Sequence, residues 1–454
     1  MSSRIKLALI PVVSAIVLGL PPATPAQIQQ QPPSSIPATQ SAAGFPQTAK
    51  PMTLAEAEAI AIQNNPQITM GKLRALVAQQ YVREARSALL PTANLSLTAV
   101  DSNPGSRIAA GLLTNPTVYP RAAGGASITQ LITDFGRTTN LLSSSEYGAK
   151  AEDENAGATR ADILLVVDQA FYNSLETKAL VRVAEETVQA RQTLSDKIQA
   201  LTDAKLKSEI DLSFSKVEVA RAKLLLLEAR NNYETSLSSL SAILGYADQQ
   251  NFQLVEEAFP VNPPVADVIP LIQQALQQRP EIKALQFEVE SARKFGNAEH
   301  DLWRPSVNAL GVVGQAPVRD DHIPSWYGAV GVNVNIPVFN GFLYSARAKA
   351  ADLQAETERQ RLLDTRNNIA RDVRNAWQDS NRAFERLSVT RQLREQADLS
   401  LDLAQARYNL GLGSIVEFTQ AELQKTEADI ADTDAKYQYR VAEIVLAFTM
   451  AAPK

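Results

Sequence analysis

The residue types that most enzymes use for catalysis are scarce in this chain of 454 residues. It has no cysteine and only two histidines, His300 and His322, which are well separated in the sequence. A nucleophilic or metal site therefore has little to be built from, and we expect both histidines at the surface or in loops. The polar residues are spread along helical stretches rather than gathered for one pocket, which argues against an enzyme. We predict no catalytic site, no metal and no cofactor.

Two carboxylates occupy equivalent places after serines that begin helices. Asp211 follows Ser208 by three residues, and Glu417 follows Ser414 by three. This spacing is typical of a capping box, in which the serine accepts a hydrogen bond from the third helical N–H and the acid returns one to the serine N–H. Capping alone would explain both carboxylates. The stretch from Tyr408 to Gly413 contains two glycines and marks the end of the preceding helix.

The helix that ends there is too long for a globular core. Between Gly341 and Leu410 the sequence has no proline, and heptad-like apolar positions alternate with charged and amide residues. Arg371, Asp372 and Arg374 lie in its middle, which excludes a lipid-buried span. About 70 residues at a rise of ~1.5 Å give a rod of roughly 105 Å. Such a run points to a coiled coil or a helical repeat.

The chain carries the same arrangement twice. Asn65-Pro66-Gln67-Ile68 is matched 214 residues later by Arg279-Pro280-Glu281-Ile282, and Pro91 is matched by Pro305 at the same distance. Further on, the distance is 206 residues. That distance relates Asp134 to Asn340, Asp211 to Glu417, and Tyr233 to Tyr439. A long helical hairpin is therefore present in two copies of nearly equal length.

The ends of the chain indicate export and a flexible start. Arg4 and Lys6 precede an apolar run from Leu7 to Leu20 and a cleavage-like Ala23-Thr24-Pro25-Ala26, which is typical of a signal peptide. A retained inner-membrane anchor is the alternative. A disordered leader rich in proline and glutamine is expected to follow. The expected boundaries are signal peptide 1–26, leader 27–50, first repeat 51–245, linker 246–266, second repeat 267–450 and tail 451–454.

Each repeat is expected to contain two short helices and a long helical hairpin, with prolines ending the short helices. The short helices are expected at Leu54–Asn64 and Gln67–Leu89, and again at Val268–Gln278 and Glu281–Trp303. The long helices are expected at Arg137–Ala200, at Ile210–Leu244, after Gly341, and at Ile415–Phe448.

Alternation of apolar and polar residues predicts strands at Ala93–Val100 and Ala329–Ile336, with less regular partners at Ala126–Ile132 and Val307–Val313. A small β-subdomain with one buried face is the alternative on alternation alone. Three features favour outer-membrane strands: a length of ~8–10 residues, direct continuation into the long helices, and aromatic residues where an interfacial girdle would lie. The girdle residues are Tyr119, Trp326 and Tyr327.

Four strands cannot close a barrel by themselves, since the smallest outer-membrane barrels have about eight. Open sheet edges are not tolerated in lipid, so several copies must join to complete the sheet. Cyclic symmetry would also let the long helices bury their apolar stripes against neighbours. The sequence alone permits two, three or four copies. The net charge is −5, and acidic and basic residues are interspersed along the sequence, so the charge pattern gives no indication of nucleic-acid binding.

Taken in order, these features resemble the TolC family of outer-membrane efflux proteins from Met52 to Met450. The resemblance rests on the junctions Asp134-Phe135-Gly136-Arg137 and Pro337-Val338-Phe339-Asn340-Gly341 and on the tip Tyr408-Asn409-Leu410-Gly411. It implies a mainly α fold with a membrane β-barrel portion. In a homotrimer, duplicated helical hairpins would form a periplasmic tunnel, and four strands per chain would build a twelve-stranded barrel in the outer membrane. The lack of cysteine matches the non-lipidated branch of the family.

By the same resemblance, the hairpin tips form a periplasmic constriction. Glu417, Gln420 and Asp211 match the positions where the family gathers acidic side chains near the axis. Carboxylates at a constriction attract cations and deter anions. Gln420 departs from the doubly acidic pattern, so we expect a weaker cation block at its level.

The resemblance also implies a latch between the hairpins and a docking surface at their tips. Asp211 and Tyr408 match the latch, whereas Gly413 occupies the position of its arginine, and Arg407 or Lys207 are the candidates to replace it. The expected contacts with a periplasmic adaptor are Lys207, Ser208, Leu410, Gly411, Leu412, Gly413 and Ser414.

We therefore predict an outer-membrane channel that passively conducts small molecules from an inner-membrane pump and a periplasmic adaptor to the exterior of a Gram-negative-type cell. One alternative is the exit duct of a type I protein-secretion system, which shares the fold. A periplasmic coiled-coil adaptor or structural protein is the alternative from a different class. Such a protein would have long hairpins but no reason for four strands of bilayer length.

Overall fold

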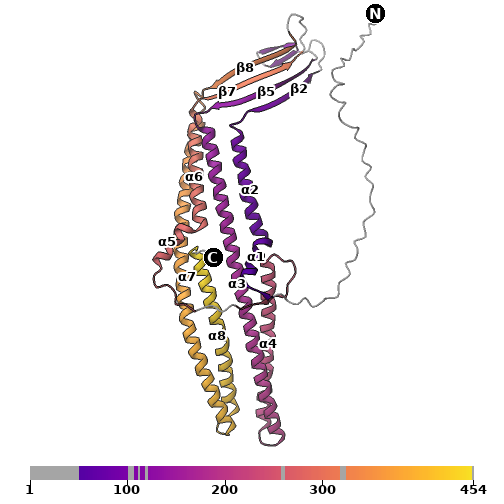
Figure 1. Cartoon of the computed structure of the whole chain (residues 1–454), viewed down its shortest axis with the longest axis vertical. Helices are drawn as coiled ribbons and strands as arrows, with labels where there is room; N and C mark the ends of the chain where they lie inside the picture. The colour runs from indigo at the N-terminus through magenta and orange to yellow at the C-terminus, as the bar shows by residue number, and fades with distance from the viewer. Residues whose placement is uncertain are drawn as a thin grey trace, which may run out of the picture. The chain divides into compact units, whose positions relative to one another are not determined.

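The structure is a computed structural model that describes residues 51–100, 107–110, 113–117, 121–256, 261–316 and 324–451. The expected signal peptide and leader lie outside the described residues, and so does Tyr119. The described elements come in two sets of the same order, each with two short helices, two strands of one sheet and a long helical hairpin (Figure 1).

Proline separates the two short helices of each set. These helices are α1 (Leu54–Asn64), α2 (Pro66–Ser87), α5 (Ile269–Gln278) and α6 (Pro280–His300). The residue before each proline, Asn65 or Arg279, has an extended backbone, as the proline ring requires. Two expected helices end earlier than predicted: α2 ends at Ser87 rather than Leu89, and α6 at His300 rather than Trp303. A 3₁₀ turn, Asp301–Trp303, follows α6, and the chain becomes extended at Arg304 ahead of Pro305.

The long helices form two hairpins of matching size. They are α3 (Arg137–Asp203), α4 (Glu209–Ile243), α7 (Leu343–Asn409) and α8 (Ile415–Thr449). Both α3 and α7 have 67 residues, and both α4 and α8 have 35. At ~1.5 Å per residue, α3 and α7 are each about 100 Å long. The tips of the hairpins lie at the end opposite the sheet (Figure 1).

A sharp left-handed turn joins the sheet to each long helix. Phe135 and Gly136 precede α3 with φ of 55° and 114°, and Gly341 and Phe342 precede α7 with φ of 62° and 67°. The Asp134 carboxylate accepts a hydrogen bond from the Thr138 N–H at 2.8 Å, which satisfies one free donor of the first turn of α3. Two successive left-handed residues lead the chain into each long helix. Residues 134–136 separate β5 from α3, and residues 336–342 separate β8 from α7.

One antiparallel sheet contains two strands from each repeat. Its order is β2 (Thr92–Val100), β5 (Arg121–Thr133), β7 (Ser306–Gln315) and β8 (Trp326–Asn335), so β2 and β8 are the edges. β5 and β7 join the two repeats through the pairing of Ala126 with Val313. Shorter strands pair elsewhere as β1 (Pro51–Met52) with β6 (Gln253–Leu254) and as β3 (Arg107–Ala110) with β4 (Leu113–Thr117).

The register gathers the exposed apolar side chains on one face of the sheet, and the other face carries polar side chains together with Leu131, Leu310 and Val312. Leu95 pairs with Ala126, Ala126 with Val313, and Val313 with Gly328, so these residues share a face. Exposed apolar residues of this face are Leu95, Leu97, Ile128, Val313, Val330 and Val332. Polar residues of the other face are Asn94, Ser96, Ser127, Asn308, Asn333 and Asn335.

Equivalent apolar cores form where the short helices pack on the long ones. In the first repeat, Ala57 and Ala61 of α1 pack with Phe171 and Leu175 of α3 and Leu240 of α4. The second-repeat core joins all four of its helices through Leu271, Ile282, Val373 and Leu446. Within the described residues, no helix combines the length and the hydropathy that crossing a membrane would require.

Candidate functional site

The two hairpin tips have the same backbone architecture. In the first tip the Leu206 N–H bonds to the Leu201 carbonyl at 2.8 Å around Lys205, whose φ is 60°. In the second tip the Leu412 N–H bonds to the Arg407 carbonyl at 2.8 Å around Gly411, whose φ is 73°. Both are helix ends closed by one left-handed residue. Residues that are 206 apart in the sequence therefore have equivalent backbone hydrogen bonds in the two tips.

A serine begins the return helix at each tip, as the spacing predicted. Ser208 accepts a hydrogen bond from the Asp211 N–H at 3.2 Å, and Ser414 accepts one from the Glu417 N–H at 3.1 Å. The returning half of the capping box is not formed at Glu417, because its carboxylate is paired with Arg407 instead. A complete capping box occurs at Thr53 and Glu56, at the start of α1.

Arg407 connects both sides of the second tip. Its Nε lies 3.0 Å from Oε1 of Glu417, and its Nη2 donates to the Leu412 carbonyl at 3.3 Å. A side chain at Gly413 would crowd this pair, since an added Cβ would lie 3.1 Å from Oε2 of Glu417 and 3.3 Å from Cβ of Arg407. Gly413 therefore leaves room for an arginine–carboxylate pair within one hairpin, where the resemblance implied an arginine for the latch.

Tyr408 is the centre of the contact between the two tips. It is buried, and its ring stacks on Phe418 with centroids 5.5 Å apart. The Lys207 ammonium lies 3.9 Å from the centroid of the Tyr408 ring, which is a cation–π contact between hairpins. Burial, with the nearby Asp211 carboxylate, raises the pKa of Tyr408. Its hydroxyl finds no hydrogen-bond partner among the described residues.

The structure thus places the expected gate and latch residues in two separate groups. Asp211 lies close to Tyr408, whose ring Lys207 covers, and Glu417 pairs with Arg407 on its own hairpin. Gln420 is exposed one helical turn after Glu417. One chain supplies each carboxylate once, so a ring of them requires several copies around an axis.

Sequence reasoning missed a buried ion pair above the tips. Arg191 of α3 pairs with Glu422 of α8, and both side chains are buried. Lys197 of α3 also donates to the side chain of Asn409 at 3.2 Å. An apolar cluster that includes Ile198, Tyr408 and Phe418 fills the space between these contacts. Arg191 and Glu422 are far apart in the sequence and carry no local motif, so no pattern identified them.

The two described aromatic residues of the expected girdle lie on opposite faces of the sheet. Trp326 pairs with Gln315 on the apolar face. Tyr327, the next residue, lies on the polar face, where its hydroxyl covers Gly125 and Gly314 of the neighbouring strands. Of these two, only Trp326 is on the face that a lipid-facing girdle requires.

No group of three or more histidine, cysteine or acidic side chains suited to a metal ion occurs in the described part of the chain. The family model described as outer membrane efflux protein matches residues 59–246 and 271–452, so each matched segment contains one long hairpin. The chain belongs to the outer membrane efflux protein family.

Known members of the family match most of the chain. The outer membrane protein TolC of Escherichia coli (strain K12) is 21% identical over 417 residues, which cover 89% of this chain and 83% of that protein. TolC of Vibrio cholerae is 23% identical over 414 residues, covering 87% and 89%. The crystal structure of the outer membrane protein VceC from Vibrio cholerae has a TM-score of 0.75 at 18% identity, covering 87% of this chain and 95% of that chain.

Family membership decides the class of protein. The chain is an outer-membrane efflux channel of Gram-negative bacteria and the outer-membrane component of a pump system, and its family is not enzymatic. The fold agrees, with long helical hairpins and four antiparallel strands. The alternative of a periplasmic adaptor is therefore wrong.

Proposed function

We propose that the channel is a homotrimer in which twelve strands close one outer-membrane barrel and the helical hairpins form a tunnel below it. The observation that carries this proposal is the incomplete sheet. β2 and β8 are edges that lack a partner within the described chain, and a lipid environment does not tolerate unpaired backbone groups. Edge-to-edge pairing of β2 with β8 of the next copy would satisfy both.

The two faces of the sheet support the same arrangement. The apolar face is bare, and Val330 on it is 91% exposed. Exposed apolar surface of this extent is suited to lipid rather than water. The asparagines and serines of the opposite face would then line a polar lumen. Substrate would pass along this lumen without any bond being made or broken.

The hairpin tips form the entrance and the docking surface in this proposal. Both tips present an equivalent pair of exposed apolar side chains, Leu206 with Ile210 and Leu412 with Val416. These residues are suited to contact with the apolar tips of a periplasmic adaptor, which would connect the channel to an inner-membrane pump. The contact of Lys207 with Tyr408 holds the two hairpins together at this level, so docking that separates the tips must break it.

The first test measures the mass of the detergent-extracted particle by native mass spectrometry. A mass of three chains is expected. Monomers in every detergent would overturn the proposal, because a single chain leaves both sheet edges unpaired. Dimers or tetramers would contradict the twelve-stranded closure.

The second test addresses the entrance. Glu417→Ala and Asp211→Asn are expected to lower the preference for cations in single-channel recordings from planar bilayers, because each removes a carboxylate from every copy at one level. Asp203→Asn is the matched control, since this exposed tip carboxylate bonds to Gln199 within its own helix. If conductance and ion preference equal those of wild type in both gate variants, the gate assignment is wrong.

A further inference from the structure

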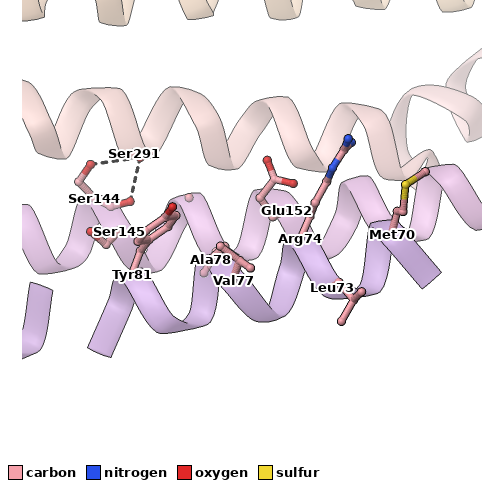
Figure 2. Close-up of a pocket in the computed structure, with 12 residues that line it drawn as sticks. Met70, Leu73, Arg74, Val77, Ala78, Tyr81, Ser144, Ser145, Glu152 and Ser291 are labelled. Atoms are coloured by element: carbon pink, nitrogen blue, oxygen red, sulfur yellow. Dashed lines mark hydrogen bonds between the residues drawn. The ribbon is translucent and has the colours of Figure 1, made fainter. Parts of the chain in front are cut away.

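Small residues of this chain occur where two of its elements come close together. Ser144 of α3 and Ser291 of α6 are in direct contact, with their hydroxyl oxygens 3.1 Å apart (Figure 2). Gly71 of α2 faces α3, where a Cβ added to this glycine would lie 3.5 Å from Cα of Ala156. A larger side chain at either place would force two packed helices apart. Glycine inside a strand likewise often marks a position that another group approaches closely.

Three residues form one row across the polar face of the sheet. Gly125 of β5 pairs with Gly314 of β7, and Gly314 pairs with Tyr327 of β8. Residues that pair directly point to the same side of an antiparallel sheet. The Tyr327 side chain therefore begins beside two successive positions that have no side chain.

The Tyr327 ring lies over both of these glycines. A Cβ added to Gly314 would lie 2.6 Å from Cζ of the ring and 2.5 Å from its hydroxyl oxygen. A Cβ added to Gly125, two strands away from Tyr327, would lie 2.6 Å from the same hydroxyl oxygen. Neighbouring strands are about 4.8 Å apart, so a ring that reaches the second strand must lie nearly flat on the sheet.

The two glycines differ in what else surrounds them. A Cβ on Gly314 would also lie 2.7 Å from the carbonyl oxygen of Gly124, and moving the tyrosine would not relieve that backbone contact. On Gly125, the nearest backbone atom would be the carbonyl oxygen of Val313, at 3.1 Å. Alanine at position 125 would therefore act mainly on the Tyr327 hydroxyl, whereas alanine at position 314 would also disturb the pairing of β5 with β7.

Tyr327 lies near the end of the sheet that is farthest from the long helices. β8 begins at Trp326 and runs to Asn335, after which the chain continues into α7 (Figure 1). In the proposed barrel, the polar face lines the lumen and this end opens to the exterior. Three copies around one axis then place three tyrosine rings at one level near the external mouth.

We propose that Tyr327 determines the size of molecule that passes the outer part of the pore, and that Gly125 and Gly314 keep its ring against the wall. The inference rests on the proposed trimer and on its polar sheet face being the lumen. Rings that lie flat leave the exit wide. A side chain at position 125 would turn all three rings towards the axis and narrow the exit.

The ring also stabilises the sheet, because an aromatic side chain packed over glycine replaces contacts that the glycine cannot make. A role in stability alone would not require the open surface that the ring retains, since Tyr327 is 45% exposed although it covers two residues. Stability does not depend on the width of the lumen. A measurement of molecular size therefore separates the two roles.

The test measures passage from outside the cell, so that it does not depend on the state of the hairpin tips. The chain contains no cysteine of its own, and Asn335→Cys introduces one on the polar face, eight residues beyond Tyr327. Intact cells are treated with a large polyethylene glycol maleimide or with N-ethylmaleimide. The ratio of the two labelling rates reports the width of the path, because the intrinsic reactivity of the thiol cancels.

Gly125→Ala in this background is expected to lower the ratio by at least about threefold, since pore diameter decides which molecules pass. Tyr327→Phe added to Gly125→Ala is expected to restore the ratio, because it removes the hydroxyl that the alanine displaces. Gly331→Ala is the matched control. It adds the same methyl group to the polar face of β8, where no atom of the described chain lies within 4 Å of it, and is expected to leave the ratio unchanged.

An unchanged ratio in Gly125→Ala, or no recovery with Tyr327→Phe, would overturn the inference. Tyr327→Ala covers a failure of Gly125→Ala to fold. A flat ring takes little of the lumen, so its removal is expected to leave the ratio near that of wild type. A rise of about threefold or more would mean that the ring already projects into the pore, which would also overturn the inference.

The proposed function fails by different results. A monomeric wild type would overturn the trimer, and a cysteine at position 335 that N-ethylmaleimide does not label would overturn the assignment of the polar face to the lumen. With a trimer and a labelled cysteine in hand, an unchanged ratio in Gly125→Ala contradicts only the role of Tyr327.

Discussion

A single left-handed residue closes each tip, and the two repeats use different residue types for it. Gly411 adopts φ of 73° with no neighbouring atom within 4 Å of where its Cβ would be. Lys205 adopts φ of 60° in the equivalent turn. This conformation costs a residue with a Cβ about 1–2 kcal/mol of conformational free energy, whereas glycine adopts it without this cost. The first tip is therefore the more strained of the two.

Lys205→Gly is expected to stabilise the first tip by about 0.5–1 kcal/mol, because the gain from removing the Cβ exceeds the extra chain entropy that glycine loses. Gly411→Ala is expected to destabilise the second tip by about 1 kcal/mol. Amide hydrogen exchange of the residues that flank each turn measures both local opening energies. Faster exchange in Lys205→Gly than in wild type would contradict the argument.

At the scale of elements, the two hairpins are joined by polar groups between α3 and the second hairpin. Glu176 of α3 lies within hydrogen-bond reach of Asp434 of α8, and Arg386 of α7 is close to both. Burial, followed by the Asp434 charge, raises the pKa of Glu176 to about 7, and burial raises that of Asp434. When Glu176 is protonated, it can donate a hydrogen bond to Asp434 across the contact between α3 and α8.

The contact makes stability depend on pH. Because the pKa of Glu176 is higher in the folded chain than its ordinary value of 4.5, its stabilising contribution is complete below about pH 4.5 and is lost as the pH rises to about 7. Glu176→Gln removes this ionisation. The variant is expected to be about 1–2 kcal/mol more stable than wild type at pH 8, after allowance for partial exposure, and similar to it at pH 4.5.

Guanidinium unfolding in detergent at pH 4.5 and pH 8 tests this prediction. Glu186→Gln, which replaces an exposed glutamate further along α3, is the matched control and is expected to keep the wild-type difference between the two pH values. A Glu176→Gln variant with an unchanged pH dependence would show that the carboxyl pair does not couple protons to folding.

At the scale of the whole molecule, the proposed barrel places opposite requirements on the two faces of the sheet. Val330 lies midway along the edge strand β8 on the apolar face, and Asn333 lies on the polar face of the same strand. A charged residue facing lipid near mid-bilayer costs about 2–4 kcal/mol, whereas one facing a lumen stays in water. The direction of a side chain, rather than its strand, decides the effect of a substitution.

Val330→Arg is therefore expected to reduce the yield of folded protein on refolding into phosphatidylcholine vesicles, measured as the heat-modifiable fraction on gels. Asn333→Arg, three residues along, is the control and is expected to fold as wild type while changing ion preference. Equal losses from the two substitutions would mean that the assignment of the faces is wrong.

The helices and strands were predictable because their signals are local. Proline at positions 66 and 280 ends one short helix and begins the next, and α1 has the bounds that the sequence predicted. Alternation identified the strands, although the register was needed to show that Trp326 and Tyr327 point to opposite faces. The 3₁₀ turn at Asp301–Trp303 was not predicted, since a helical pattern does not distinguish it from the last turn of α6.

The sequence by itself determined the duplication, the two hairpins, the strands and the serine caps at the tips, because each follows from neighbours along the chain. Only the tertiary structure decided which partners the charged groups of the site have. Glu417 pairs with Arg407 and Lys207 covers Tyr408. Arg191 meets Glu422 in the same region. These partners come together only when two helices pack in one register. The spacing of apolar residues predicts which face of a helix is buried, but not which charged residue of the other helix will contact it.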